Sequence, residues 1–379
     1  MATSPILRPS PATLPRRRTR PKQTSLTLFP TAARHGACES PSVASAPTPV
    51  PDRRTKPATD LVGIARLAAS SPRAEAKRGT EYFLLPVRSI LNHCDSERVP
   101  FRWTINPYRG CEFGCKYCYA RYTHEYMELD GGEFESKIFV KQDAGALMER
   151  ELAAENTRGE HIALGTATDP YQPAEREFGA TRAILEKMAA REGLILEITT
   201  KSNQIVRDID LLRRIAERST VRVNMSVACM RTRLARLLEP RAPRPDLRLE
   251  AVSRLRDAGI EVGVNAMPIL PGLTDGEEDL DQLVRAVSAS RALWIAGGVL
   301  FLMPSSLKQF LPFLGQKFPK LLRRYQEWYG RGGYAPENYR KEIAARFEKL
   351  RHKYGISMRP AMPAAQPQYS PQMALSLTP

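Results

Sequence analysis

Residues 111–119 read Cys111-Glu-Phe-Gly-Cys115-Lys-Tyr-Cys118-Tyr119 and place three thiols within eight residues. This close spacing lets one loop turn all three thiolates toward the same metal centre. Closed structural metal sites have four protein donors, whereas a centre with three protein donors keeps one position open for a small molecule. The loop therefore predicts a metal centre that binds a substrate or cofactor.

Around this loop the sequence alternates between short apolar runs and amphipathic helical segments. The expected strands are 101–105, 162–165, 194–198, 221–227, 260–264 and 293–296, the last resuming at 299–303. Strand and helix alternating at roughly thirty-residue intervals predict a parallel sheet with helices outside it, either open or curled into a barrel. In such folds ligands bind at the carboxyl ends of the strands. The cysteine loop follows the first expected strand, so it belongs at that end.

Composition limits the classes that fit the chain. The 379 residues carry a formal net charge of +16, which raises encounter with any polyanion. No apolar run reaches the length of a membrane span. The six cysteines are too few and too clustered for a disulfide framework, which favours reduced thiols and a cytoplasmic location.

The two ends of the chain differ from its middle. Residues 1–60 hold eleven of the 31 prolines and ten Lys or Arg, so we expect a disordered tail rather than a transit peptide. Beyond residue 305 two helical segments are expected, at 318–329 and 336–354. Their interleaved basic and aromatic residues suit nucleic acid, but we favour an apolar face packed on the barrel.

From the residues alone, the three cysteines also fit a structural zinc site with His124 as the fourth ligand. Such a protein would be a zinc-stabilised, non-catalytic nucleic-acid-binding module. Tyrosines flank Cys118, and the chain already has enough apolar residues for a core. Both features favour the open metal centre over zinc.

The Cys-x3-Cys-x2-Cys spacing, with an aromatic residue before the third cysteine, resembles the signature of the radical S-adenosylmethionine (SAM) superfamily. Residues 106–121 are similar to the spore photoproduct lyase-like branch, often labelled "DNA repair photolyase". Further matches are Gly165-Thr-Ala-Thr-Asp169-Pro-Tyr-Gln-Pro173, Thr199-Thr-Lys201-Ser202 and Glu239-Pro-Arg, with Pro268-Ile-Leu-Pro271-Gly-Leu. The resemblance covers about residues 95–305.

This resemblance implies an α/β fold, a partial (β/α)6 TIM-like barrel with a helical C-terminal extension and a disordered N-terminal tail. It implies that Cys111, Cys115 and Cys118 hold a 4Fe–4S cluster whose fourth iron binds SAM. Reductive cleavage of SAM then yields a 5′-deoxyadenosyl radical that abstracts hydrogen from a substrate. The expected cofactor-binding residues are Tyr117, Tyr119, Thr166, Thr168, Asp169, Lys201, Asn224 and Ser226.

Spore photoproduct lyase also uses a cysteine hydrogen donor at the end of its second barrel strand, but residues 165–169 contain none. Tyr119 keeps the tyrosine match, and Tyr119 and Cys229 are the candidate catalytic residues. Cys229 or Cys94 could donate hydrogen or ligate a second metal centre. The resemblance implies a one-electron donor of the flavodoxin or ferredoxin type and, weakly, a DNA or RNA substrate. The expected divisions are a tail at 1–60, a connecting segment at 61–95, the radical SAM barrel at 96–305, a basic extension at 306–357 and a flexible tail at 358–379.

Overall fold

The centre of the protein is a seven-stranded sheet, seen in a computed structural model that describes residues 60–77, 79–96, 99–155 and 157–361. The strand order is β11-β10-β9-β8-β7-β4-β3, and every neighbouring pair is parallel except β3 with β4. The strands are β3 (Leu91–His93), β4 (Trp103–Ile105), β7 (His161–Leu164), β8 (Ile195–Thr200), β9 (Thr220–Ser226), β10 (Glu261–Ile269) and β11 (Ile295–Val299).

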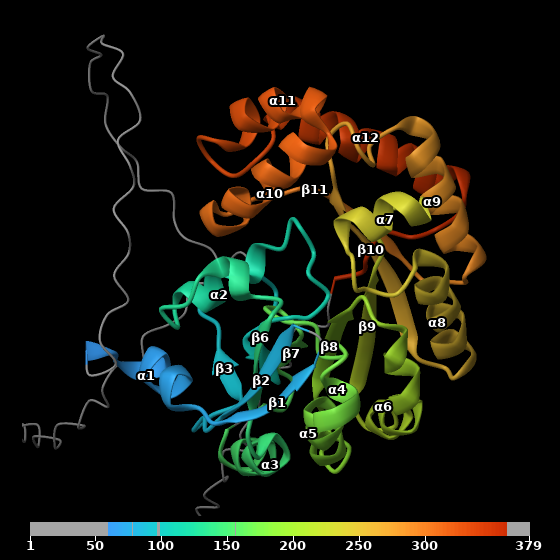
Figure 1. The fold of residues 1–379 in the computed structure, drawn as a ribbon. Coiled ribbons are helices and arrows are strands. Elements are labelled where there is room, and N and C mark those ends of the chain that lie inside the picture. Colours follow the sequence, from blue (N-terminus) through green and yellow to red (C-terminus); the bar gives the residue numbers. More distant parts are fainter. Residues whose placement is uncertain (1–59, 78, 97–98, 156, 362–379) are drawn as a thin grey trace, which may run out of the picture.

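Helices cover the outside of the six parallel strands, as the alternating pattern predicts (Figure 1). They are α3 (Ala144–Ala154), α4 (Glu175–Phe178), α5 (Ala180–Met188), α6 (Ile209–Ala216), α7 (Thr232–Leu238), α8 (Pro245–Asp257) and α9 (Glu277–Ala289), with the 3-10 helix η4 (Asn203–Asp208) before α6. The apolar stripes of α5, α6 and α9 are buried in one continuous core. The partial (β/α)6 barrel is confirmed.

A second, smaller sheet precedes and flanks the barrel, and the sequence analysis missed it. Its order is β1-β2-β6-β5. The elements are α1 (Gly63–Ser70), β1 (Arg73–Lys77), β2 (Thr80–Leu85), β5 (Tyr108–Arg109) and β6 (Lys137–Lys141), with η2 (Tyr119–Arg121), α2 (Tyr122–Glu125) and η3 (Gly131–Glu133) between β5 and β6. The expected connecting segment 61–95 therefore contains a helix and three strands, while residues 1–59 lie outside the described part.

The C-terminal extension consists of α10 (Pro304–Lys317), α11 (Pro319–Tyr329) and α12 (Glu337–Lys353). Two helices were expected here, and α10 is a third that the sequence did not indicate. Tyr325, Tyr329 and Phe347 are at most 4% exposed. The aromatic residues of the extension thus serve mainly as the buried face that we favoured.

The chain then returns to the amino-terminal end of the barrel strands. Ser357 forms an isolated parallel bridge with Trp294. The guanidinium of Arg359 bonds the buried carboxylate of Glu197 on β8, which also accepts a 2.5 Å hydrogen bond from Asn224. Within the expected tail from residue 358, Arg359 and Ala361 contact the barrel, whereas residues 362–379 lie outside the described part.

Candidate active site

The three cysteines follow β4 and β5 on a loop that backbone and side-chain hydrogen bonds hold in place. Cys111 N donates to the Phe134 carbonyl at 2.9 Å, and Lys116 N donates to the Leu238 carbonyl at 2.9 Å. The buried guanidinium of Arg121 donates to the Cys115 carbonyl at 3.2 Å. Because these anchors come from separate parts of the fold, the loop geometry depends on the assembled barrel.

One cavity of about 380 Å³ brings the three thiols together at the carboxyl ends of the strands. Its wall includes residues from the ends of β7, β8, β9, β10 and β11, with the aromatic rings of Phe113, Phe134 and Phe301. Gly165 sits at a close approach in this wall: its φ is +91°, and a Cβ there would lie 2.6 Å from the Thr199 carbonyl oxygen. A side chain is therefore poorly tolerated at this position.

The donor set fits an iron–sulfur cluster better than a zinc ion. Cys111, Cys115 and Cys118 are free cysteines. Within the described ranges, no three His, Cys, Asp or Glu side chains already converge on the position of one ion. A cubane binds each thiolate at a different iron and so separates its ligands more than one zinc does. His124 does not line the cavity, and its Nε2 lies 2.9 Å from the Lys137 carbonyl oxygen.

A buried charge network lies behind the loop. The Tyr117 hydroxyl donates to Glu239, whose other carboxylate oxygen forms a 2.5 Å ion pair with Arg248. Burial raises the pKa of the Glu239 carboxyl, but Arg248 and Lys201 outweigh it and hold that pKa below its usual range. Burial alone would lower the pKa of the Lys201 ammonium, but Cys115 and Glu239 raise it, so Lys201 stays a cation. Its Nζ lies 5.9 Å from the Tyr117 ring centroid.

Two of the expected cofactor ligands are already engaged within the protein. Asp169 accepts hydrogen bonds from Thr200 Oγ1, Lys201 N and Tyr171 N at 2.7, 2.7 and 2.9 Å. Thr168 Oγ1 donates to the Gly110 carbonyl at 2.6 Å, just before Cys111. Both residues line the cavity, but these bonds shape its wall.

Other expected ligands line the cavity with free surface toward it. Tyr119, Thr166 and Ser226 are part of the wall, and the Tyr119 hydroxyl donates to the Thr166 carbonyl. Asn265 also lines the cavity, paired in register with Ser226, and its buried Oδ1 has no hydrogen-bond partner. Asn265 was not among the expected ligands, although its position directly after the fifth expected strand, 260–264, was a usable signal.

Asn224 and Cys229 do not line this cavity, contrary to expectation. Asn224 bonds Glu197 and Trp294 in the lower barrel. It shares a strand face with Ser226 but lies two residues earlier, which is about 6.6 Å lower along the strand. Cys229 is 2% exposed and directs its thiol to the Arg231 carbonyl at 3.8 Å. Neither position supports a contact with SAM or with the reacting substrate.

Comparison with known proteins agrees with this geometry. A family model described as the Radical SAM superfamily matches residues 105–284. An uncharacterized protein of Mycobacterium tuberculosis is 36% identical over 322 residues, which cover 84% of this chain and 93% of that protein. An uncharacterized protein of Methanocaldococcus jannaschii is 31% identical over 176 residues, covering 46% of this chain and 63% of that protein. This chain belongs to the radical SAM superfamily.

Solved structures of spore photoproduct lyase share its fold. One mutant matches with a TM-score of 0.54 at 16% identity, covering 72% of this chain and 79% of that chain. A double mutant with bound AdoMet and dinucleoside spore photoproduct gives a TM-score of 0.54 at 16% identity, covering 78% and 86%. At this identity the likeness concerns the fold.

As a radical SAM enzyme, the protein uses a 4Fe–4S cluster and SAM and requires a one-electron donor. Across the part of the chain that the structure describes, no helix combines the length and the apolar character needed to cross a membrane.

Proposed function

We propose that Cys111, Cys115 and Cys118 hold the cluster, and that SAM binds beside it in the cavity at the barrel mouth. The observation that carries this proposal is the meeting of three free thiols in one cavity at the carboxyl ends of parallel strands. When bound, the cluster and SAM supply an electron and a sulfonium whose cleavage yields a carbon radical. The protein's tasks are to bind, orient and exclude water.

The residues in the wall divide these tasks by their chemistry. Lys201 offers a cation to the carboxylate of the methionine moiety. Ser226 and the partnerless Oδ1 of Asn265 offer hydrogen-bonding groups to the polar parts of SAM. Tyr117 is held by Glu239, so its ring gives a fixed surface beside the cysteines. The phenylalanine rings of the wall keep water from the radical.

Anaerobic reconstitution tests the ligand assignment. Cys115→Ala should remove the cluster absorbance and the formation of 5′-deoxyadenosine with dithionite and SAM, because two thiolates do not retain a cubane. Cys229→Ala is the matched control and should keep both signals, since Cys229 lies outside the cavity. An intact cluster spectrum in the Cys115 variant would refute the assignment.

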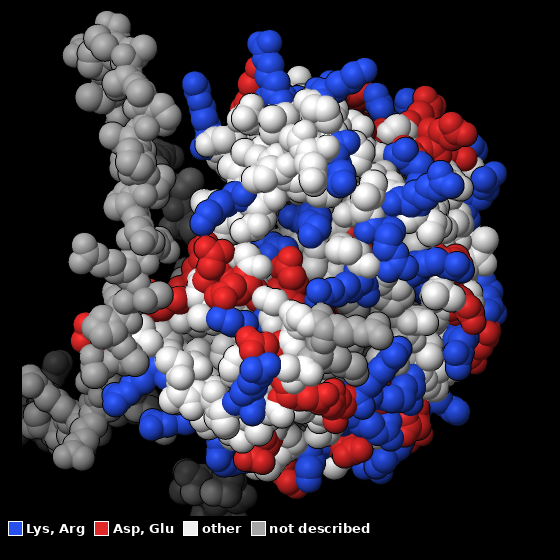
Figure 2. Space-filling view, in the orientation of Figure 1, with Lys and Arg blue, Asp and Glu red and all other residues white. Residues whose placement is uncertain are grey.

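We further propose a nucleic-acid substrate. The formal net charge of +16 favours polyanions, and Figure 2 shows Lys and Arg side chains over much of one face, interrupted by an acidic patch. Spore photoproduct lyase, with the same fold, has been solved with a dinucleoside spore photoproduct. Residues 165–169 hold no cysteine donor, so the proposal does not extend to that lyase's reaction.

Turnover in D2O with oligonucleotides tests the substrate. The expected result is nucleic-acid-dependent consumption of SAM with a changed oligonucleotide mass. Equal 5′-deoxyadenosine formation with and without DNA and RNA, and no mass change in either, would refute a nucleic-acid substrate. For the electron donor we propose a flavodoxin or ferredoxin, since such acidic carriers complement a basic protein. We also propose a cytoplasmic location, because the five free cysteines among the described residues suit a reducing compartment.

A further inference from the structure

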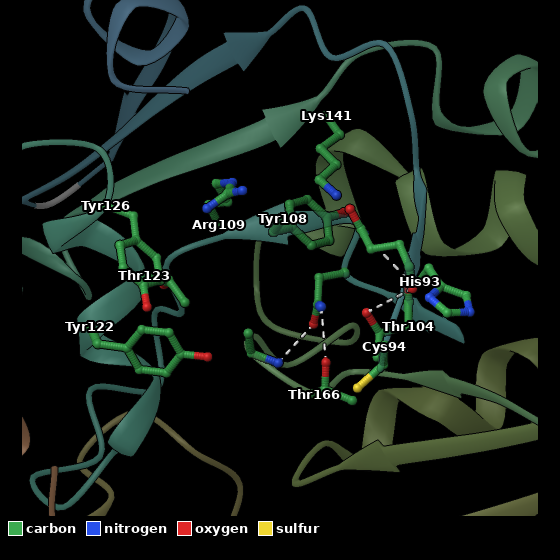
Figure 3. A pocket seen from close by; sticks show the side chains of 13 residues that line it. His93, Cys94, Thr104, Tyr108, Arg109, Tyr122, Thr123, Tyr126, Lys141 and Thr166 are labelled. Carbon is green, nitrogen blue, oxygen red and sulfur yellow. Dashed lines mark hydrogen bonds between the residues drawn. The ribbon is translucent and has the colours of Figure 1, made fainter. Parts of the chain in front are cut away.

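We propose that a second cavity, formed by β3, β4, β5, β6 and α2, binds a phosphate group of the substrate. This proposal rests on the proposed nucleic-acid substrate. Phosphate binding itself can be measured whether or not that substrate is correct. The cavity has a volume of about 70 Å³, which suits a group of a few heavy atoms. Figure 3 shows Lys141, Arg109 and Tyr122 turned toward the same hollow.

Two cations line this cavity, and neither has a carboxylate partner. Lys141 is 5% exposed. Over the described residues, no ion pair within 4.0 Å involves Lys141 or Arg109. The buried Nε of Arg109 has no hydrogen-bond partner. The acid that acts on Lys141 is Glu151, but its carboxylate already accepts bonds from Ile90 N and Leu91 N at 3.0 and 2.7 Å.

Buried charges without partners are unfavourable, and a protonated Lys141 lies beside a second charge of the same sign. Burial and the neighbouring Arg109 lower the pKa of Lys141 to about 7. A structural lysine would reach solvent or an acid with its ammonium. Lys141 instead ends at a hollow beside a second cation, and an incoming oxyanion would satisfy both. Arg and Lys are the residues that bind phosphate most often in proteins.

The second cavity adjoins the radical cavity through one shared wall. Thr166 and Ala167 line both cavities. Asn106 fixes this wall, because its amide donates to the Thr166 hydroxyl at 3.0 Å and its oxygen accepts from Ala167 N at 2.8 Å. A phosphate bound here would therefore lie on the other side of this wall from the cavity that holds the thiols. At the rim, Tyr126 is 48% exposed and its ring meets Tyr122 edge-on at 5.4 Å, which leaves an aromatic surface for a base.

The test measures binding of inorganic phosphate and of the dinucleotide thymidylyl-thymidine to anaerobically reconstituted full-length protein by calorimetry. Thymidine, which lacks phosphate, is the comparison ligand. Lys141→Met should weaken binding of both phosphate-containing ligands by roughly tenfold to a hundredfold and leave thymidine unaffected. Lys141→Arg should restore binding, and Lys349→Met on the exposed face of α12 should match the wild type.

Wild-type affinity for phosphate in Lys141→Met, or no phosphate binding by the wild type, would overturn the proposal. If Lys141→Met does not fold, Arg109→Met decides instead, because Arg109 is the second cation that lines the cavity. Wild-type affinity for phosphate in that variant would also overturn the proposal. The outcome is distinct from a failure of the proposed function. If the proposed function is wrong, SAM is not cleaved although phosphate still binds. If only the phosphate site is wrong, phosphate does not bind although SAM is cleaved.

Discussion

Glu239→Gln is the sharpest test of the charge network that supports the cysteine loop. The side chains of Glu239 and Arg248 are 2% and 1% exposed, and they form an ion pair at 2.5 Å. Glutamine keeps the shape of glutamate and can still accept a hydrogen bond from Tyr117. The substitution therefore removes charge and little else.

The size of the effect follows from burial. Without Glu239 the cations of Arg248 and Lys201 remain buried with no counter-charge from this carboxylate. Removing one partner of a buried pair costs about 3–5 kcal/mol. At about 2–4 °C per kcal/mol for a large domain, the melting temperature should fall by roughly 6–20 °C. The Arg248 bonds to the Pro243 and Ser226 carbonyls, at 2.8 and 2.9 Å, offset only part of the loss.

Thermal unfolding of the anaerobic protein, followed by circular dichroism, measures this loss. The double variant Glu239→Gln/Arg248→Met removes the unpaired arginine and should recover part of the stability. Glu327→Gln breaks the exposed pair with Arg323 and should leave the melting temperature unchanged. A Glu239→Gln protein that melts within about 2 °C of the wild type would refute the reasoning, because it would mean that the pair is not desolvated.

Three further changes address the cavity, its wall and the neighbouring histidine. Lys201→Ala should weaken SAM binding in calorimetry while iron content stays the same, and unchanged affinity would remove Lys201 from the site. Gly165→Ala should destabilise the protein by at least about 1–3 kcal/mol in denaturant unfolding, because the new Cβ meets the Thr199 carbonyl oxygen at a backbone φ of +91°. Burial lowers the pKa of His124 to about 4. The contribution of its neutral imidazole to the free energy of unfolding is therefore complete above pH 6.5 and falls as the pH drops toward 4. The wild type should lose about 2 kcal/mol more than His124→Gln between pH 7 and pH 5, and equal losses would contradict this assignment.

The sequence predicts the barrel well because its signals are local. Apolar runs mark the six parallel strands, and the spacing of Cys111, Cys115 and Cys118 marks the loop. The small sheet is harder, because β1 reads Arg-Ala-Glu-Ala-Lys and β5 has two residues, so neither shows an apolar strand pattern. Helix α10 is also hard to predict from sequence, because Pro312 lies inside it and proline usually interrupts a helix.

A second limit of prediction from sequence concerns the site residues. The sequence does not show how far along a strand the cavity extends. Periodicity places Asn224 and Ser226 on one face of β9, but it does not say where the cavity floor lies. The floor is a layer beneath the cavity that does not line it. It is set by partners distant in sequence, namely Glu197 on β8, Trp294 before β11 and Arg359 after α12. Asn224 belongs to that floor, and Ser226 to the cavity above it. Only the folded chain separates the two.

The same floor explains why the segment after α12 matters to the site at the opposite end of the barrel. The segment after α12 lies at the amino-terminal end of the barrel strands, where Ser357 bridges Trp294. Arg359 bonds Glu197, and the Ala361 carbonyl accepts a 3.2 Å hydrogen bond from Arg222 at the lower end of β9. These contacts cover the amino-terminal end of the strands with chain that carries no catalytic group. The cysteines, Lys201 and Asn265 line the cavity at the carboxyl ends of the strands, so we expect the substrate to enter at that end of the barrel.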